Sequence, residues 1–215
     1  MSHTHQYHSE GLYPCVRIID CFDRGETKQD FGGNYDITTL ADGAGTIDNT
    51  TYISWVTMVT GATATNQEGL RIIDPLVVRS RQYCAEILVY LDQIIATEFR
   101  FGYYLAADEY CYIEFDASVN ANWRLVVNDT TGAQYATPTG GAVAALTNYY
   151  LTLWLEIDGT PHWMVGTQFM REQLLITDLA KKMTASEHYC QFWVNTEADA
   201  AKTARVDYLE TIKDK

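Results

Sequence analysis

The chain has 215 residues, of which 47% are hydrophobic and 20% charged, and 28 acidic residues against 15 basic ones give a net charge of −13. This length fits one β domain with a sizeable core, and the composition excludes an intrinsically disordered chain. The acidic balance argues against nucleic acid and against an anionic membrane surface as partners, because both would repel it.

The beginning of the chain differs in composition from the rest. Residues 1–14 are polar and show no periodicity, which predicts an extended N-terminal arm ahead of a single domain over residues 15–215. The start lacks the apolar segment of a secretory signal, and no apolar run approaches the roughly 20 residues of a membrane span. The five cysteines are odd in number and have no metal-ligand spacing, so we expect reduced thiols in a protein made in a cytoplasm.

The first two thirds of the chain predict short strands. A strand at 16–22 precedes a Gly-, Asp- and Asn-rich loop region at 23–50, which encloses one short strand near 35–40. Further strands are expected at 52–60, 69–73, 83–95, 98–105, 110–115 and 123–127. Residues 83–95 are apolar on both faces, which is typical of a central strand.

The last third gives the clearest pattern. Residues 149–158 alternate for ten positions between an apolar and a more polar face, as a half-buried strand does. Gly159 and Pro161 predict a hairpin turn into a strand at 162–165. Strands at 189–194 and 204–212 complete the sheets.

One segment has helical rather than alternating spacing. In residues 170–183, Leu175, Leu179 and Met183 share a helix face at intervals of four, which predicts one short helix. With about twelve strands and this helix, the sequence predicts an all-β, antiparallel β-sandwich.

Three stretches resemble the concanavalin A-like lectin and glucanase jelly roll, which also occurs in laminin G-like modules. They are a strand with a polar Gly turn at 123–132, the strand and turn at 149–159, and the closing strand at 206–209. The resemblance covers residues 52–215 and implies a jelly-roll sandwich.

A tryptophan in mid-domain, Trp123, and the terminal residues 206–208 are similar to versions that tailed bacteriophages encode. Those proteins are often virion components, including capsid decoration (cement) proteins. The resemblance therefore implies a non-enzymatic virion structural protein made in the host cytoplasm. Its implied partners are the major capsid protein and further copies of itself, as a homotrimer.

The arm supplies the candidate interface residues of that hypothesis, which are His3, His5, Tyr7, His8 and Tyr13. A segment that cannot pack on its own is suited to being ordered against a neighbouring subunit, and tyrosine is enriched at interface hot spots. The imidazoles are also potential metal ligands, but a flexible terminus does not preorganise them, so we predict no metal centre there.

Two Glu-x-Asp pairs, Glu114 with Asp116 and Glu156 with Asp158, raise the question of glycoside hydrolysis. Laminarinase-like members of the superfamily carry Glu-x-Asp-x-x-Glu, whose two glutamates flank the scissile bond. The second glutamate is absent here: residue 119 is valine and residue 161 is proline. We therefore expect no enzyme and interpret these carboxylates as solvated polar faces of strands.

The alternative function is carbohydrate binding by a lectin-like module. Sugar sites combine an aromatic platform with polar groups that fix hydroxyls. Trp123 with Asn120 and Asn122 offers that combination, and the competing interpretation of Trp123 is a core residue.

Two further polar clusters are weaker alternatives. Tyr103 and Tyr104 lie beside Asp108 and Glu109, a second aromatic and polar combination. The acidic loop at 42–49 contains oxygen ligands suited to Ca²⁺, although it does not match an EF-hand. No other cofactor is expected.

Overall fold

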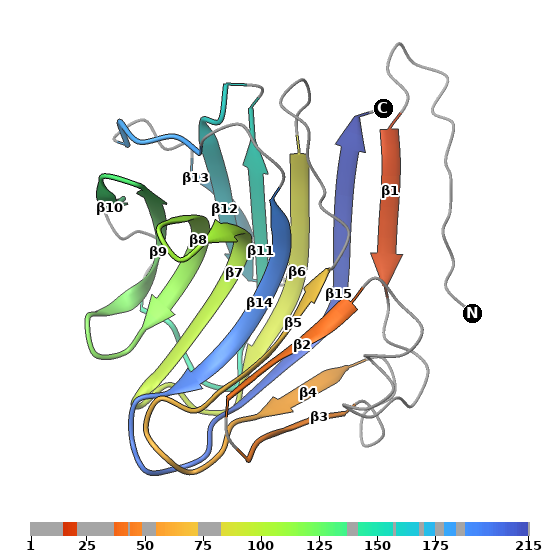
Figure 1. The fold of residues 1–215 in the computed structure, drawn as a ribbon. Helices are drawn as coiled ribbons and strands as arrows, with labels where there is room; N and C mark the ends of the chain where they lie inside the picture. Colours follow the sequence, from red (N-terminus) through yellow and green to blue (C-terminus); the bar gives the residue numbers. More distant parts are fainter. Residues whose placement is uncertain are drawn as a thin grey trace.

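The computed structural model shows an antiparallel sandwich of two β-sheets (Figure 1). It describes residues 15–20, 37–42, 44–48, 55–72, 83–136, 142–156, 158–167, 170–174, 179–183 and 188–214, with backbone alone for 15–20, 37–42, 72, 83, 170–174 and 208–214. These residues form fifteen strands and no helix, hence no helix able to cross a membrane. The expected all-β sandwich is confirmed, while the predicted arm lies outside the described residues.

The first sheet has eight strands, in the order β13-β12-β11-β6-β15-β4-β3, with β1 pairing β15. Its strands are β1 (Cys15–Asp20), β3 (Thr46–Asp48), β4 (Val56–Val59), β6 (Tyr83–Leu91), β11 (Asn148–Leu155), β12 (Pro161–Thr167), β13 (Met170–Leu174) and β15 (Thr203–Asp214). The predicted central strand is confirmed, because β6 lies between β11 and β15 and buries Ile87, Leu88 and Val89 in succession.

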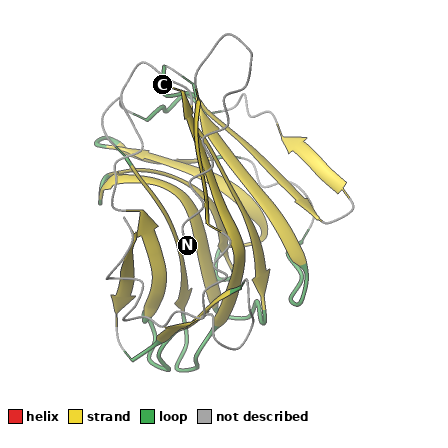
Figure 2. Cartoon of the chain, turned by 90° about the vertical axis from the view of Figure 1, so that its right-hand side faces the viewer, coloured by secondary structure: helices red, strands yellow, loops and turns green. Residues whose placement is uncertain are grey.

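The second sheet has seven strands, in the order β10-β9-β8-β7-β14-β5-β2. Its strands are β2 (Ile37–Asp42), β5 (Gln67–Ile72), β7 (Thr97–Ala106), β8 (Glu109–Asp116), β9 (Asn120–Asp129), β10 (Gly132–Tyr135) and β14 (Tyr189–Thr196). Its long strands bend strongly, and the face turned away from the other sheet lies on the inside of the bend (Figure 2).

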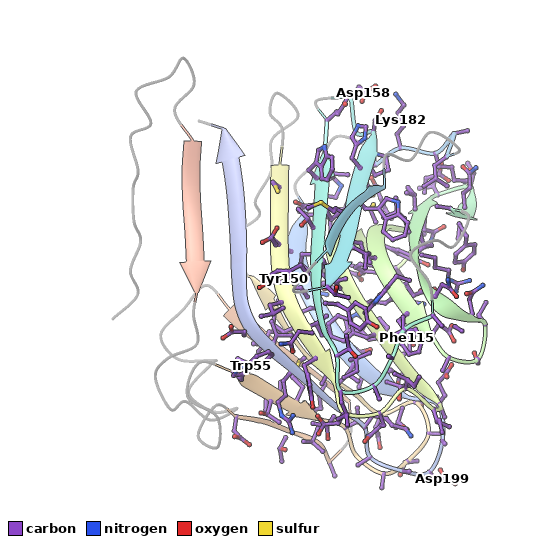
Figure 3. The ribbon with its side chains drawn as sticks, turned by 180° about the vertical axis from the view of Figure 1, so that it is seen from behind. Trp55, Phe115, Tyr150, Asp158, Lys182 and Asp199 are labelled. Carbon is purple, nitrogen blue, oxygen red and sulfur yellow. The ribbon has the colours of Figure 1, made fainter. Side chains whose placement is uncertain are left out.

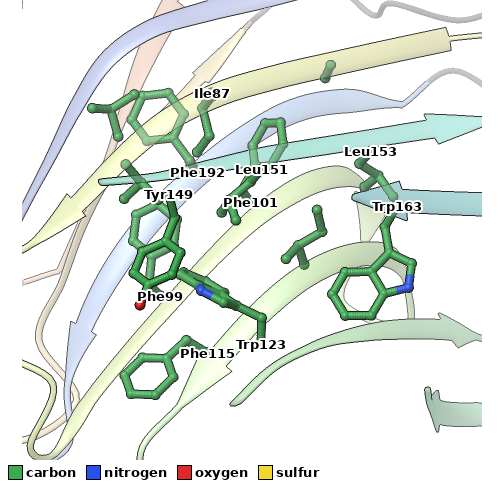
Figure 4. Packing of buried hydrophobic residues seen from close by; sticks show 14 of the residues in the cluster. Ile87, Phe99, Phe101, Phe115, Trp123, Tyr149, Leu151, Leu153, Trp163 and Phe192 are labelled. Carbon is green, nitrogen blue, oxygen red and sulfur yellow. The ribbon is translucent and has the colours of Figure 1, made fainter. Parts of the chain in front are cut away.

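The core lies between the sheets and follows from strand alternation. Phe99 and Phe101 of β7 face Leu151 and Leu153 of β11, and all four are fully buried (Figure 4). Each such side chain contributes about 1.5–3 kcal/mol through removal from water. The apolar residues that alternate over positions 149–155 are therefore buried against the core, as the sequence predicts. The three cysteines whose side chains the structure describes, Cys84, Cys111 and Cys190, form no disulfide with one another.

The predicted hairpin after residue 158 is also present. β11 and β12 pair antiparallel, with Leu155 opposite Pro161. Gly159 has a φ of +82°, a conformation that side-chain-bearing residues rarely adopt. Its N–H donates to the carbonyl of Glu156 at 2.8 Å, which closes the turn.

The predicted helix over 170–183 is wrong. Residues 170–174 form β13, which pairs antiparallel with β12 from Thr167–Met170 to Trp163–Leu174, and residues 179–183 are irregular. Arg171, Glu172 and Gln173 are good helix formers, so local propensity favours a helix. Only two residues separate β12 from β13, and ladder pairing with β12 satisfies the backbone groups instead.

Candidate functional site

Trp123 is not available as an aromatic platform, because it lies in the core with 1% of its surface exposed. Its indole contacts Phe99 edge-on at 6.1 Å and Tyr149 at 5.6 Å between ring centroids. Strand alternation places the half-buried Asn120 and Asn122 on the opposite face of β9, so the three predicted residues do not form one site. The arrangement matches the interpretation of Trp123 as a core residue.

The other predicted clusters are also divided by the fold. Tyr103 is buried in the core, where its hydroxyl donates to the carbonyl of Leu153 at 3.3 Å, whereas Tyr104 faces outward. Glu109 is buried beside His188, with 3.8 Å between Oε1 and Nε2. Burial lowers the pKa of His188 to about 4, so this imidazole is neutral at pH 7.

The structure bears on the candidate calcium loop but not on the candidate interface arm. The arm residues lie outside the described part of the chain. Within the acidic loop at 42–49, residues Thr46–Asp48 form β3 rather than loop. Across the described ranges, no group of three or more His, Cys, Asp or Glu side chains is placed to hold a metal ion.

A different set of residues comes together on the outward face of the seven-stranded sheet. The strand registers align five residues in one row across β9, β8, β7, β14 and β5, and this row is Arg124, Glu114, Arg100, Trp193 and Gly69. Gly69 leaves room for the neighbouring indole, because a Cβ there would lie 2.3 Å from Cβ of Trp193. Strand register therefore aligns the row, and the absence of a side chain at Gly69 makes space for Trp193.

A second row on the same face is mainly aromatic. Asn128, Tyr110, Tyr104 and Tyr189 are aligned across β9, β8, β7 and β14. The three tyrosines are half-buried, so part of each ring reaches the surface. These three residues, which we call the aromatic strip, are register neighbours on three adjacent strands.

Glu114 is the centre of an ion-pair cluster on this face. Its side chain is 0% exposed; Nε of Arg124 donates to Oε1 at 2.7 Å, and Nε of Arg100 lies 2.5 Å from Oε2. Arg100 also pairs with Glu98 at 2.6 Å, and Arg124 lies 3.8 Å from Asp116. The expectation of a solvated strand face is thus wrong for Glu114, because the curved sheet and the two arginines enclose it.

Burial also affects the protonation of this cluster. Loss of solvation raises the pKa of Glu98, and the nearby positive charge of Arg100 offsets part of that rise. A buried ion pair of this kind contributes little net stability, but losing one partner is costly because the remaining charge stays buried.

Arg100 connects the ion pairs to the aromatic rings. Its guanidinium carbon lies 5.0 Å from the ring centroid of Trp193 and 5.9 Å from those of both Tyr110 and Tyr112. Tyr110 and Tyr112 are themselves stacked at 4.9 Å. These cation–π contacts hold the rings in fixed positions.

Two further arginines repeat this arrangement on either side. Arg71 lies 4.5 Å from the ring centroid of Tyr104 and 5.6 Å from that of Tyr189, and Arg124 lies 4.3 Å from that of Tyr135. Tyr135 is 48% exposed and ends the face on β10. The outward face thus offers ordered aromatic rings interleaved with fixed polar groups.

The second Glu-x-Asp pair lies elsewhere and agrees with the expectation of a solvated strand end. Glu156 and Asp158 are exposed at the hairpin between β11 and β12. Asp158 pairs with Lys182, and Figure 3 shows the two side chains together at this end of the molecule. Hydrogen bonds from Lys182 and Thr160 lower the pKa of Asp158.

No protein-family model and no curated protein matches the sequence. Solved structures do match it. A protein of unknown function from Shewanella oneidensis MR-1 has a TM-score of 0.74 at 12% identity, with 97% of this chain and 90% of that chain covered. Peanut lectin with a nine-residue peptide has a TM-score of 0.61 at 10% identity, with 93% and 97% covered. The fold is a lectin-like jelly roll.

A third jelly-roll structure belongs to a study of endo-acting O-glycanases that gut bacteria use to initiate mucin breakdown. It has a TM-score of 0.65 at 7% identity, covering 90% of this chain and 97% of that chain. Identities this low establish the jelly-roll fold alone. None of these three structures is described as a virion component, so the capsid assignment, its homotrimer and its localisation stay predictions.

The sequence contains a partial signal for the outward face. Residues 100, 102 and 104, residues 110, 112 and 114, and residues 189, 191 and 193 are alternate positions of predicted strands. Alternation alone places each set on one face, but only the strand order shows that the three sets are neighbours.

Proposed function

We propose that this protein is a carbohydrate-binding module that binds a neutral glycan along the outward face of the seven-stranded sheet. The observation that carries the proposal is the strip of Tyr110, Tyr104 and Tyr189, each partly accessible and held by arginine contacts. The lectin-like fold supports the same class of ligand.

The chemistry of the strip suits sugars. The C–H faces of a pyranose pack against aromatic rings, while amides, hydroxyls and guanidinium groups fix its hydroxyls. The three rings lie on three neighbouring strands, about 4.8 Å apart along the sheet, so the strip is long enough to contact more than one sugar ring. A chain of sugars therefore fits it better than a single ring.

The charges of the face favour a neutral ligand. The ion-pair cluster and the arginine beside it bring three guanidinium groups together with three carboxylates, those of Arg71, Arg100, Arg124, Glu98, Glu114 and Asp116. The chain as a whole carries −13, which repels an anionic polymer.

Binding without hydrolysis is part of the proposal. Glu114 is enclosed by two guanidinium groups and has no exposed surface, so it reaches neither a sugar nor a water molecule. The position of a second catalytic glutamate in that motif is occupied by Val119. General acid–base catalysis needs both groups.

The test is a panel of neutral glycans measured against wild type and a Tyr104→Ala/Tyr189→Ala double variant. We expect the double variant to lose more than about tenfold in affinity, or about 1.4 kcal/mol, because two of the three rings of the aromatic strip are removed. Trp154→Ala, on the other sheet, is the matched aromatic control. Equal glycan affinity of the wild type and the double variant, or no binding of any glycan by the wild type, would sink the proposal.

A further inference from the structure

A small cavity lies on the outward face of the other sheet, the eight-stranded one. It has a volume of about 260 Å³ and is lined by Trp55, Tyr90, Asn148 and Arg205. Figure 3 shows Trp55 near β4 and β15, far from the Asp158–Lys182 end of the molecule. It belongs to neither the aromatic strip nor the ion-pair cluster described above.

Strand register builds this cavity. Tyr90 of β6 is directly opposite Asn148 of β11 on one side and Arg205 of β15 on the other. Trp55 immediately precedes β4, which pairs with β15. Three lining residues therefore belong to one row across neighbouring strands, and such rigid elements position side chains more precisely than loops do.

Two aromatic rings form the apolar walls. Trp55 and Tyr90 lie 6.3 Å apart between ring centroids, with an angle of 72° between their planes. The guanidinium of Arg205 packs over Tyr90 at 5.3 Å. The cavity is thus lined by two aromatic rings whose planes are steeply inclined to each other, with the guanidinium of Arg205 beside Tyr90.

The polar side chains at the cavity, Arg205 with its partner Asp92 and the uncharged Asn148, carry no net charge. Asp92 holds the Arg205 guanidinium through two contacts, one of 2.9 Å from Nη2 to Oδ2 and one of 2.7 Å from Nη1 to Oδ1. The charge of Arg205 is therefore balanced, which disfavours a carboxylate ligand. Its position over Tyr90 also disfavours a cation, because the ligand would meet a like charge.

We propose that this cavity is a second ligand site, which takes one neutral, hydroxyl-bearing ring such as a single pyranose. Its volume is slightly below the roughly 300–1,000 Å³ of sites for drug-sized molecules, so it fits one ring. The ring packs against one aromatic wall, and the Asn148 amide and the Arg205 guanidinium lie within the lining to bond hydroxyls. This site goes beyond the proposed function and does not depend on it.

The test is ligand-observed NMR with a panel of neutral hexoses, N-acetylhexosamines and their methyl glycosides at millimolar concentration. We expect at least one to bind the wild type saturably and to bind Trp55→Ala at least about tenfold more weakly. Asn148→Ala is a second variant, with the same expected direction, in case Trp55→Ala does not fold. Trp154→Ala, on the same sheet but outside the cavity, controls for loss of an aromatic ring and retains binding.

The outcomes separate the two sites. The Tyr104→Ala/Tyr189→Ala variant keeps monosaccharide binding if the cavity is the site, whatever happens to its binding of longer glycans. The cavity proposal is overturned if no sugar of the panel binds, or if binding survives both Trp55→Ala and Asn148→Ala. It is also overturned if acetate or tetramethylammonium, rather than a neutral sugar, binds the cavity, as shown by loss of that binding in Trp55→Ala.

Discussion

Glu114 illustrates how single residues determine the character of the proposed binding face. Its carboxylate is fully buried and balances two arginines that in turn position four aromatic rings. Removing that one charge leaves both guanidinium groups without their main partner in a poorly solvated place.

We therefore expect Glu114→Gln to lower the free energy of unfolding by about 3–5 kcal/mol, as measured by urea denaturation. The control is Glu156→Gln, since Glu156 is exposed and pairs only with His162 at 2.7 Å among the described contacts. We expect less than about 1 kcal/mol from that control. Equal effects of the two substitutions would contradict the structural role assigned to Glu114.

A second prediction at this scale concerns pH. Burial lowers the pKa of His188 to about 4 in the folded protein, against an ordinary value near 6.5. Below pH 6.5 the unfolded chain therefore binds a proton that the folded chain does not, and stability falls until about pH 4.

The measurement is the free energy of unfolding at pH 7 and at pH 4.5, for wild type and His188→Gln. We expect the loss between these pH values to be about 2 kcal/mol smaller in the variant, because it lacks the titrating imidazole. If wild type and variant lose the same amount, His188 is not the group responsible.

At the scale of elements, hairpins show where backbone geometry demands glycine. Gly159 and Gly132 both have positive φ, at +82° and +115°. A Cβ on Gly159 would lie 2.1 Å from the carbonyl oxygen of Met183, whereas one on Gly132 would meet nothing within 4 Å. A substitution at Gly132 therefore causes backbone strain alone, whereas one at Gly159 causes both backbone strain and steric overlap.

We expect Gly132→Ala to cost about 1 kcal/mol of stability from strain alone, and Gly159→Ala to cost clearly more. Thermal or urea unfolding of the two variants provides the comparison. A smaller loss for Gly159→Ala than for Gly132→Ala would show that the contact with Met183 is readily relieved.

Sequence-based prediction was correct for some strands and wrong for others. Alternation identified β11 and the buried side of β7, because a half-buried strand must repeat every two residues. It failed for β13, where pairing with β12 overrides helix propensity, and it missed the short β3 and β10. The candidate site was beyond reach, because Tyr104, Tyr110 and Tyr189 become neighbours only through strand order and register.

At the scale of the whole molecule, the two candidate sites lie on opposite outer faces of the sandwich. One is a strip on the curved seven-stranded sheet, and the other is a cavity on the eight-stranded sheet. The core between them is continuous and apolar, so neither site shares a side chain with the other. Each ligand is therefore expected to bind without competing with the other.

The central claim is that a glycan occupies the outward face of the seven-stranded sheet. The most direct measurement is NMR mapping of backbone amide shifts in isotope-labelled protein as a neutral oligosaccharide from the panel is added. We predict that the largest shifts lie in β7, β8 and β14, around Tyr104, Tyr110 and Tyr189. Shifts confined to the other sheet, or none with any oligosaccharide, would contradict the proposed function.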